Sequence, residues 1–314
     1  MDMKDYILEK YQIRKSNKEK LQFIEYIKSR LQDAGYEENK IVIEEKGKGL
    51  FKTRNIVVGD VEQAKVVLGA HYDTCAVLPF PNFMSPTSVP LFVLSQIAVT
   101  LIILAMAFLC GMIVAIVSGD SMLGASTSLL SLYVLLFQML FGYRNKHTAN
   151  DNTSGVVAIT KILESLSLEE REKVCVVYFD NEEKGLLGSE FFKKKHKNIM
   201  KEKFLINLDC VGDGENVTVL TSAKKQEDEL CKKFLRIMQE KSAYHNVNFI
   251  HDKLRKLMFP SDQMHFAKGI GVCALRKSSV GLYVARIHTP FDTVCRKENI
   301  EYLVDGIHHF IEML

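Results

Sequence analysis

The segment V-L-G-A-H-Y-D-T, residues 67–74, joins a strand pattern to two groups that can serve a metal ion. The apolar run 66–68 is β-branched in character and predicts a buried strand. His71 and Asp73 follow, two residues apart, so at strand spacing they point to the same side. An imidazole can bind a metal through one nitrogen while a carboxylate orients the ring through the other. Taken alone, the pair is equally compatible with two solvated residues at a strand end.

Composition narrows the class of protein. The chain has 314 residues and a net charge of +3, which does not indicate a nucleic-acid binder. Its seven cysteines are dispersed and include no C-x-x-C pair, which favours a reducing compartment over a disulfide framework. The N-terminal segment has no apolar core of the signal-peptide kind, so we expect no secretory signal.

A long uncharged segment interrupts the soluble pattern. Residues 75–119 contain no Asp, Glu, Lys, Arg or His. Two apolar stretches, roughly 89–117 and 124–143, are each long enough for a membrane span, which needs about 20 residues. The sequence therefore predicts a transmembrane helical hairpin within an insert at 75–147, preceded by a proline-containing connector. The alternative is a very hydrophobic helix pair buried in a soluble protein.

The flanking charges predict an orientation for this hairpin. The loop around Asp120 has no Lys or Arg, whereas Arg144 and Lys146 follow the second span. The positive-inside rule then places both hairpin ends in the cytoplasm. We expect an integral membrane protein whose soluble domain, residues 1–74 and 148–314, is cytoplasmic. Gly and Ser positions in the hairpin also allow a homodimer contact.

The remaining chain alternates strand and helix patterns. This alternation predicts an α/β fold with a mixed, mostly parallel central sheet and helices on both faces. The predicted strands are 41–45, 51–58, 66–70, 174–179, 204–208, 217–220 and 271–275. The predicted helices include the N-terminal region up to Gly35, with Ser16 and Glu19 as a capping box, and segments 225–241 and 299–314.

Acidic and imidazole groups recur just after the apolar strands, and one more lies at a helix start. They are His71, Asp73, Glu182, Glu183, Asp209, His288 and, at the helix start, Asp151. In open α/β sheets, ligands bind outside the carboxyl ends of the strands, so we expect these groups to converge. The set suits zinc, with manganese or cobalt as substitutes. In a Glu-Glu pair, one carboxylate can bind metal while the other acts as a base; a solvated loop is the alternative.

Six motifs carry a resemblance to a known family. They are G-A-H-Y-D-T (69–74), A-N-D-N-T-S-G (149–155), F-D-N-E-E-K-G-L-L-G-S (179–189), N-L-D-C-V-G (207–212), S-D-Q (261–263) and H-T-P-F-D-T (288–293). In this order they resemble the co-catalytic di-zinc aminopeptidases, a family that includes bacterial leucyl aminopeptidases, aminopeptidase Y, glutamate carboxypeptidases and glutaminyl cyclases. The resemblance implies a zinc-exopeptidase fold.

The resemblance also implies a role for each matching position. It implies a two-zinc site in which His71 and Asp209 bind one ion, Glu183 and His288 bind the other, Asp151 bridges them, Asp73 orients His71, and Glu182 is the general base. The expected activity is removal of N-terminal residues from peptides with a free N-terminus. One alternative is an acyl transfer like that of glutaminyl cyclases, although the chain lacks their pocket tryptophans. Another is a non-catalytic membrane receptor or scaffold.

Two departures from the family pattern stand out. The hairpin lies between His71 and Asp151, so we expect the bilayer to lie near the mouth of the site. Ile287 stands where relatives often carry an aromatic residue, which leaves the oxyanion contact open; Arg286 and Tyr283 are candidates. A basic run at 193–197 is either a solvated helix end or a contact with anionic lipid.

Overall fold

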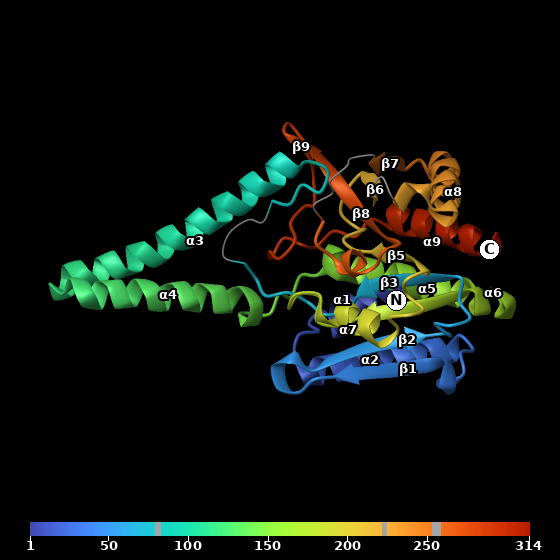
Figure 1. The fold of residues 1–314 in the computed structure, drawn as a ribbon, viewed down its shortest axis with the longest axis horizontal. Coiled ribbons are helices and arrows are strands. Elements are labelled where there is room, and N and C mark those ends of the chain that lie inside the picture. The colour runs from blue at the N-terminus through green and yellow to red at the C-terminus, as the bar shows by residue number, and fades with distance from the viewer. Residues whose placement is uncertain (79–82, 222–224, 253–258) are drawn as a thin grey trace.

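The computed structural model describes residues 1–314 apart from 79–82, 222–224 and 253–258 (Figure 1). The helices are α1 (Met3–Lys10), α2 (Asn17–Asp33), α3 (Val89–Ser118), α4 (Ser121–Phe141), α5 (Gly155–Ser165), α6 (Leu168–Lys173), α7 (Leu187–Lys195), α8 (Glu229–His245) and α9 (Lys297–Glu312). The strands are β1 (Ile41–Lys46), β2 (Thr53–Val58), β3 (Val66–His71), β4 (Val174–Phe179), β5 (Phe204–Leu208), β6 (Asn216–Leu220), β7 (Asn248–Asp252), β8 (Gly269–Ser278) and β9 (Gly281–Tyr283).

The strands form one mixed sheet in the order β1-β2-β4-β3-β5-β8-β6-β7, with β9 paired to β8. The centre is parallel: β3 lies between β4 and β5, and β5 pairs with β8. The β1–β2, β2–β4, β6–β8 and β8–β9 pairings are antiparallel. The predicted α/β fold is confirmed. Because β3, β4 and β5 run in the same direction, their carboxyl ends meet at one edge of the sheet.

Helices cover both faces of this sheet, as predicted. On one face, apolar side chains of α2, α5, α8 and α9, such as Phe23, Ile159 and Phe310, form the larger core with alternate residues of the central strands. On the other face, Phe192 of α7 and Phe266 pack in a second cluster on the remaining strand side chains. The central strands are buried on both sides, which explains their unbroken apolar sequences.

Helices α3 and α4 form a hairpin that leaves the rest of the molecule on one side (Figure 1). Both are long and apolar enough to cross a membrane by length and composition, and most of the side chains in their most apolar stretches are exposed. Exposed apolar residues such as Phe108, Ile116 and Leu130 run along them. The two helices therefore project from the α/β domain rather than pack within its core.

Small residues bring the two helices of the hairpin together. A side chain at Gly111 would collide with Ser128 and the Gly124 backbone, and one at Gly124 would collide with Ala115. Close approach through small residues is a common way for membrane helices to pack. These small positions are occupied within one chain, so the homodimer contact remains a prediction that would need another face of the hairpin.

Some boundaries differ from the prediction for local reasons. The second apolar helix begins at Ser121 rather than 124, because the Asp120 carboxylate accepts hydrogen bonds from two backbone N–H groups of its first turn. The helix ends at Phe141 rather than 143, with Gly142 as its cap. The predicted capping box of Ser16 and Glu19 is present. Helix α6 and strand β7 were not predicted; both are short.

Candidate metal centre

Three adjacent strands deliver side chains to one edge of the sheet. His71 is the last residue of β3, Glu182 and Glu183 follow β4, and Asp209 follows β5. β3 is the parallel neighbour of both β4 and β5. The topology therefore brings together groups that are up to 138 residues apart in sequence, as the strand-end rule for open α/β sheets predicts.

Two further groups reach this edge from loops. Asp151 lies in the coiled segment Ala149–Ser154 that precedes α5. Its backbone N–H and that of Asn150 donate hydrogen bonds of 3.0 and 2.7 Å to the buried carboxylate of Asp292. His288 follows β9 and has a left-handed backbone, with φ of 60°. Because Asp292 lies four residues after His288, these two hydrogen bonds hold the two loops together near the strand ends.

Asp151 lies between the two imidazoles. Its Oδ1 is 3.3 Å from His71 Nε2, and its Oδ2 is 3.1 Å from His288 Nε2. On the first side, His71 Nε2 is also 3.5 Å from Asp209 Oδ1. On the second side, His288 Nε2 is 3.2 Å from Glu183 Oε2. The five predicted ligands therefore form two groups that share one carboxylate.

Asp73 contacts both parts of the site. Its carboxylate lies 3.6 Å from His71 Nδ1, and its backbone oxygen is closer, at 3.2 Å. The carboxylate also accepts hydrogen bonds from the backbone N–H groups of Glu182 and Glu183, at 3.0 and 3.3 Å. Asp73 thus links the end of β3 to the turn after β4, an arrangement that the sequence pattern did not predict.

Glu182 lines a cavity of about 250 Å³ together with the predicted ligands. Apolar side chains complete the wall, including those of Met84, Phe259 and Ile287. The cavity is small by the standard of ligand sites, which run to about 300–1,000 Å³.

The charges of the site fit a bound cation. Burial raises the pKa of Glu182 well above its usual value, and the Glu183 and Asp209 carboxylates add to the rise. Burial also acts to raise the pKa of Asp151, but hydrogen bonds with His288 and His71 hold it below its ordinary value. Several carboxylates are therefore buried close together, which costs folding free energy unless a positive charge compensates them.

Unsatisfied oxygen atoms support the same conclusion. Within the described part of the chain, the buried atoms Glu183 Oε1 and Asp209 Oδ1 have no hydrogen-bond partner. Buried polar atoms in native proteins are normally paired. Each atom belongs to a residue of one of the two ligand groups, so the residues present fit two divalent cations with nitrogen and oxygen ligands.

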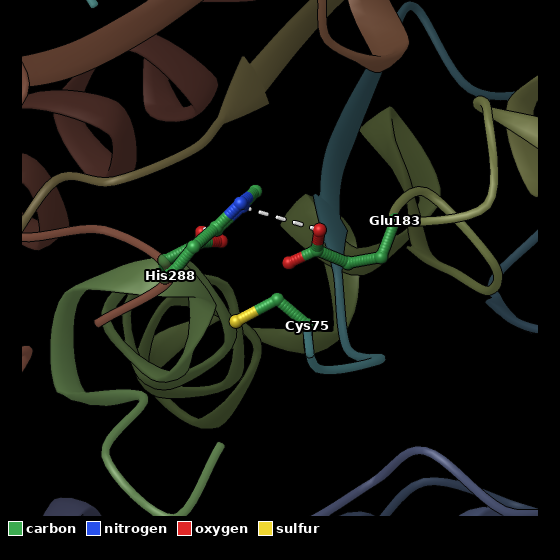
Figure 2. Close-up of side chains that lie close together, drawn as sticks. Cys75, Glu183 and His288 are labelled. Carbon is green, nitrogen blue, oxygen red and sulfur yellow. Dashed lines mark ion pairs between the residues drawn. The ribbon is translucent and has the colours of Figure 1, made fainter. Parts of the chain in front are cut away.

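A cysteine also lies in the second group, which the sequence analysis did not anticipate. Cys75 Sγ is within 4.8 Å of ligand atoms of Asp151, Glu183 and His288. Figure 2 shows its side chain beside those of Glu183 and His288. Burial raises the pKa of the Cys75 thiol, and the Glu183 carboxylate adds to the effect. The position of Cys75 just after the H-Y-D-T motif was the only sequence signal.

The two residues proposed for the oxyanion contact, Arg286 and Tyr283, lie outside the cavity lining. Arg286 Nε donates a 2.8 Å hydrogen bond to the buried carboxylate of Asp213. Neither Arg286 nor Tyr283 is among the described residues that line the cavity. Asp292, which holds the backbone of Asp151, had no predicted role, although it lies within the H-T-P-F-D-T motif.

A mixed α/β sheet with two His-carboxylate groups at its carboxyl edge defines a protein of the zinc-exopeptidase fold. The model of one family, peptidase family M28, matches residues 131–309, more than half of the chain. The chain belongs to peptidase family M28. The matched region includes Asp151, Glu182, Glu183, Asp209 and His288, whereas His71 precedes it. A comparison with curated protein sequences gives no significant match.

Solved structures with the same fold have low sequence identity to this chain. A glutaminyl cyclase from Porphyromonas gingivalis superposes with a TM-score of 0.61 and 14% identity, covering 99% of this chain and 95% of its own. A Zn-dependent exopeptidase from Parabacteroides distasonis gives 0.59 and 14%, covering 98% and 96%. The LapA aminopeptidase of Legionella pneumophila gives 0.56 and 12%, covering 98% and 69%. At such identity the likeness establishes the fold.

Proposed function

We propose that this chain is a membrane-embedded aminopeptidase that holds two zinc ions and removes N-terminal residues from peptides. The observation that carries the proposal is the position of Asp151, whose two carboxylate oxygens face different imidazoles. A carboxylate placed in this way is suited to bridge two cations. His71 and Asp209 would hold one ion, and Glu183 and His288 the other.

Glu182 and Asp73 have separate roles in the proposed mechanism. Two zinc ions held by these residues would supply Lewis-acid chemistry and would lower the pKa of water in the site. Glu182 lines the cavity beside the ligands and is the candidate general base, taking a proton from the attacking water and passing it to the leaving amine. Asp73 holds Glu182 in place through the backbone N–H of that residue.

The size and lining of the cavity favour an exopeptidase. A volume of about 250 Å³ accommodates one terminal residue. The apolar wall formed by Met84, Phe259 and Ile287 favours an uncharged side chain there. The carboxylates beside the wall attract the free α-amine of a peptide. We therefore propose peptides with an apolar N-terminal residue as the substrate class.

The membrane part of the proposal rests on the hairpin. Its two helices are exposed and apolar, and we propose that residues 75–147 form a membrane insert within a domain made of 1–74 and 148–314. Arg144, just after α4, forms a 2.6 Å ion pair with Glu19 of the soluble domain. Positive charge at this end favours a cytoplasmic location for the catalytic domain.

The test is digestion of a peptide library by the detergent-purified full chain, with and without a chelator, alongside metal counting by mass spectrometry. Two zinc ions per chain and stepwise, chelator-sensitive loss of N-terminal residues are expected. One zinc ion and ammonia release from peptides with N-terminal glutamine would instead indicate a glutaminyl cyclase. A zinc-loaded chain that turns over neither kind of substrate would overturn both enzymatic assignments.

A further inference from the structure

The turn between β1 and β2 exposes two adjacent apolar side chains. Residues 47–52, G-K-G-L-F-K, form this turn, which we call the β1–β2 tip. Leu50 is 64% exposed and Phe51 is 55% exposed. Figure 1 shows the tip on the side of the molecule from which α3 and α4 leave. Adjacent exposed Leu and Phe residues at a turn call for an explanation.

The tip lies beside the end of a proposed membrane helix. The ring of Phe51 packs edge-on against that of Phe141, with centroids 5.9 Å apart. Phe141 is the last residue of α4. If α4 crosses a bilayer, its end lies at the boundary between acyl chains and headgroups. Phe51 is then at the same depth, where aromatic side chains are enriched in membrane proteins.

Contacts with the rest of the soluble domain fix the tip at this depth. The Asn17 side chain donates a hydrogen bond of 3.2 Å to the Gly49 carbonyl, and Lys184 Nζ donates one of 2.7 Å to the Leu50 carbonyl. The end of α4 is bound to the same region, because Lys15 Nζ donates a 2.8 Å hydrogen bond to the Leu140 carbonyl. The tip and the helix end are therefore parts of one rigid surface.

Lysines surround the exposed apolar pair. Lys48 is exposed and forms no ion pair with any described residue. Lys52 pairs with Glu45 at 2.8 Å, and Lys46 lies over the ring of Phe191. Glu45, the acidic residue nearest to the tip in sequence, also pairs with Arg54 at 2.7 Å, so its charge is compensated. Apolar side chains ringed by lysines match the surface of an anionic bilayer.

We propose that the β1–β2 tip rests in the headgroup region of the bilayer that α3 and α4 cross, with Leu50 and Phe51 inserted and Lys48 beside anionic lipid. The inference rests on the proposed membrane span. The tip is a third point of attachment besides the two helix ends, so it fixes the tilt of the soluble domain on the membrane.

The chain contains no tryptophan, so one introduced residue gives a unique fluorescent reporter. We would reconstitute three single-tryptophan variants of the full chain in vesicles of phosphatidylcholine and phosphatidylserine that contain brominated lipid as quencher. Leu50→Trp reports on the tip. Leu109→Trp, within α3, reports on the span. Leu168→Trp, 77% exposed at the start of α6, is the matched control on the soluble domain.

Leu50→Trp should emit at shorter wavelength than Leu168→Trp and be quenched by bromine placed near the headgroup end of the acyl chain. Leu109→Trp should be quenched by bromine deep in the bilayer. Quenching of Leu109→Trp with an unquenched Leu50→Trp would overturn the tip proposal and leave the span intact. An unquenched Leu109→Trp would show that α3 does not cross the bilayer. The tip proposal would then fail as well, because it depends on that span.

A charge variant tests whether Lys48 is attracted to anionic lipid or only lies near the bilayer. Adding Lys48→Gln to the Leu50→Trp chain should weaken insertion about fivefold in vesicles with phosphatidylserine and have little effect in phosphatidylcholine alone. The control is Lys232→Gln, at an exposed position of α8, a helix that lies on the opposite side of the molecule from the hairpin (Figure 1); it should change insertion in neither vesicle type. Equal effects of Lys48→Gln in both vesicle types would remove the anionic-lipid contact from the proposal.

Discussion

The backbone N–H of Leu78 donates a 2.8 Å hydrogen bond to the carbonyl oxygen of His288. Leu78 belongs to the connector that leads to α3, and its side chain packs with Ile103 of that helix. Residues of α4 such as Leu135 join the same cluster. One residue therefore joins the base of the hairpin to a candidate metal ligand, and disturbance of the hairpin can reach the site by a single contact.

This contact can be tested by removing its donor. Leu78→Pro deletes the N–H, so His288 loses the bond that helps to hold its left-handed backbone. We expect kcat/KM on an aminoacyl reporter to fall by roughly 10- to 100-fold in nanodiscs, because small displacements of a catalytic group are costly. Leu78→Ala keeps the N–H and is the control. Equal activity of the proline variant would show that the contact does not position His288.

Glu182→Gln should separate chemistry from metal binding. The amide cannot accept a proton from water, and loss of a general base typically costs about 10²- to 10⁴-fold in rate. Zinc content should stay at the wild-type level, because Glu182 is not one of the proposed ligands. Glu190→Gln, in the first turn of α7, is a matched control outside the cavity lining. Turnover by Glu182→Gln at the wild-type rate would exclude the base role.

Asp292→Asn should weaken metal binding although Asp292 is not one of the proposed metal ligands. Asp292 accepts hydrogen bonds from the backbone N–H groups of Asn150 and Asp151, which position the proposed bridging carboxylate. Loss of such outer contacts commonly costs about 10- to 100-fold in metal affinity. Competition with a fluorescent zinc chelator measures the affinity. The control is Asp305→Asn in α9, which pairs with Lys241 of α8 outside the cavity lining and should leave zinc affinity unchanged.

Lys20→Met should destabilise the domain strongly. Lys20 is buried in α2, where its ammonium pairs with the buried Asp180 carboxylate and donates a 2.6 Å hydrogen bond to Asn181 Oδ1. Removing one partner of a buried ion pair costs about 3–5 kcal/mol, because the other charge is left uncompensated. Circular dichroism of thermal unfolding in detergent measures the loss.

Two further variants make this stability test specific. The double variant Lys20→Met with Asp180→Asn should recover part of the stability, since no buried charge is left unpaired. The exposed Lys18→Met should be nearly neutral. If Lys20→Met alone unfolds no more readily than Lys18→Met, the buried pair does not stabilise the domain.

The stability of the domain should depend on pH through Glu44. Burial acts to raise the pKa of Glu44, but hydrogen bonds from His196 and Lys195 hold it below its usual 4.5. The resulting stabilisation is therefore fully present above pH 4.5 and is lost as the pH falls through the folded-state pKa. Glu44→Gln should lower the free energy of unfolding at pH 6, and the difference from the wild type should disappear at low pH, where the wild-type carboxyl is protonated. A difference independent of pH would refute this account.

Much of the architecture could be predicted because its signals are local. The apolar runs of β3, β4 and β5 mark strands buried on both faces, and the Ser16 and Glu19 capping box marks the start of α2. Three predicted ligands, His71, Glu183 and Asp209, stand at or just after the ends of these strands, so the strand-end rule was enough to expect those three together. Their roles as zinc ligands and base remain predictions.

Other features had no local signal. The carboxylate of Asp73 holds the Glu182 turn, and Asp292 holds Asp151 across 141 residues of sequence. Phe51 meets Phe141 at the end of α4. Periodicity reports whether a residue is buried within its own element, but it carries no information about which distant segment covers it.

The sequence by itself determined that this protein has an α/β domain with candidate metal ligands after its strands and a long apolar insert within the domain. Residue type and spacing set strand burial, helix length and the chemistry of the candidate ligands. Only the tertiary structure decided that Asp151 lies between two imidazoles, that Leu78 ties the insert to His288, and that the β1–β2 tip stands at the end of α4. Such contacts arise from the packing of whole elements, and strand order and loop path are properties of the folded chain.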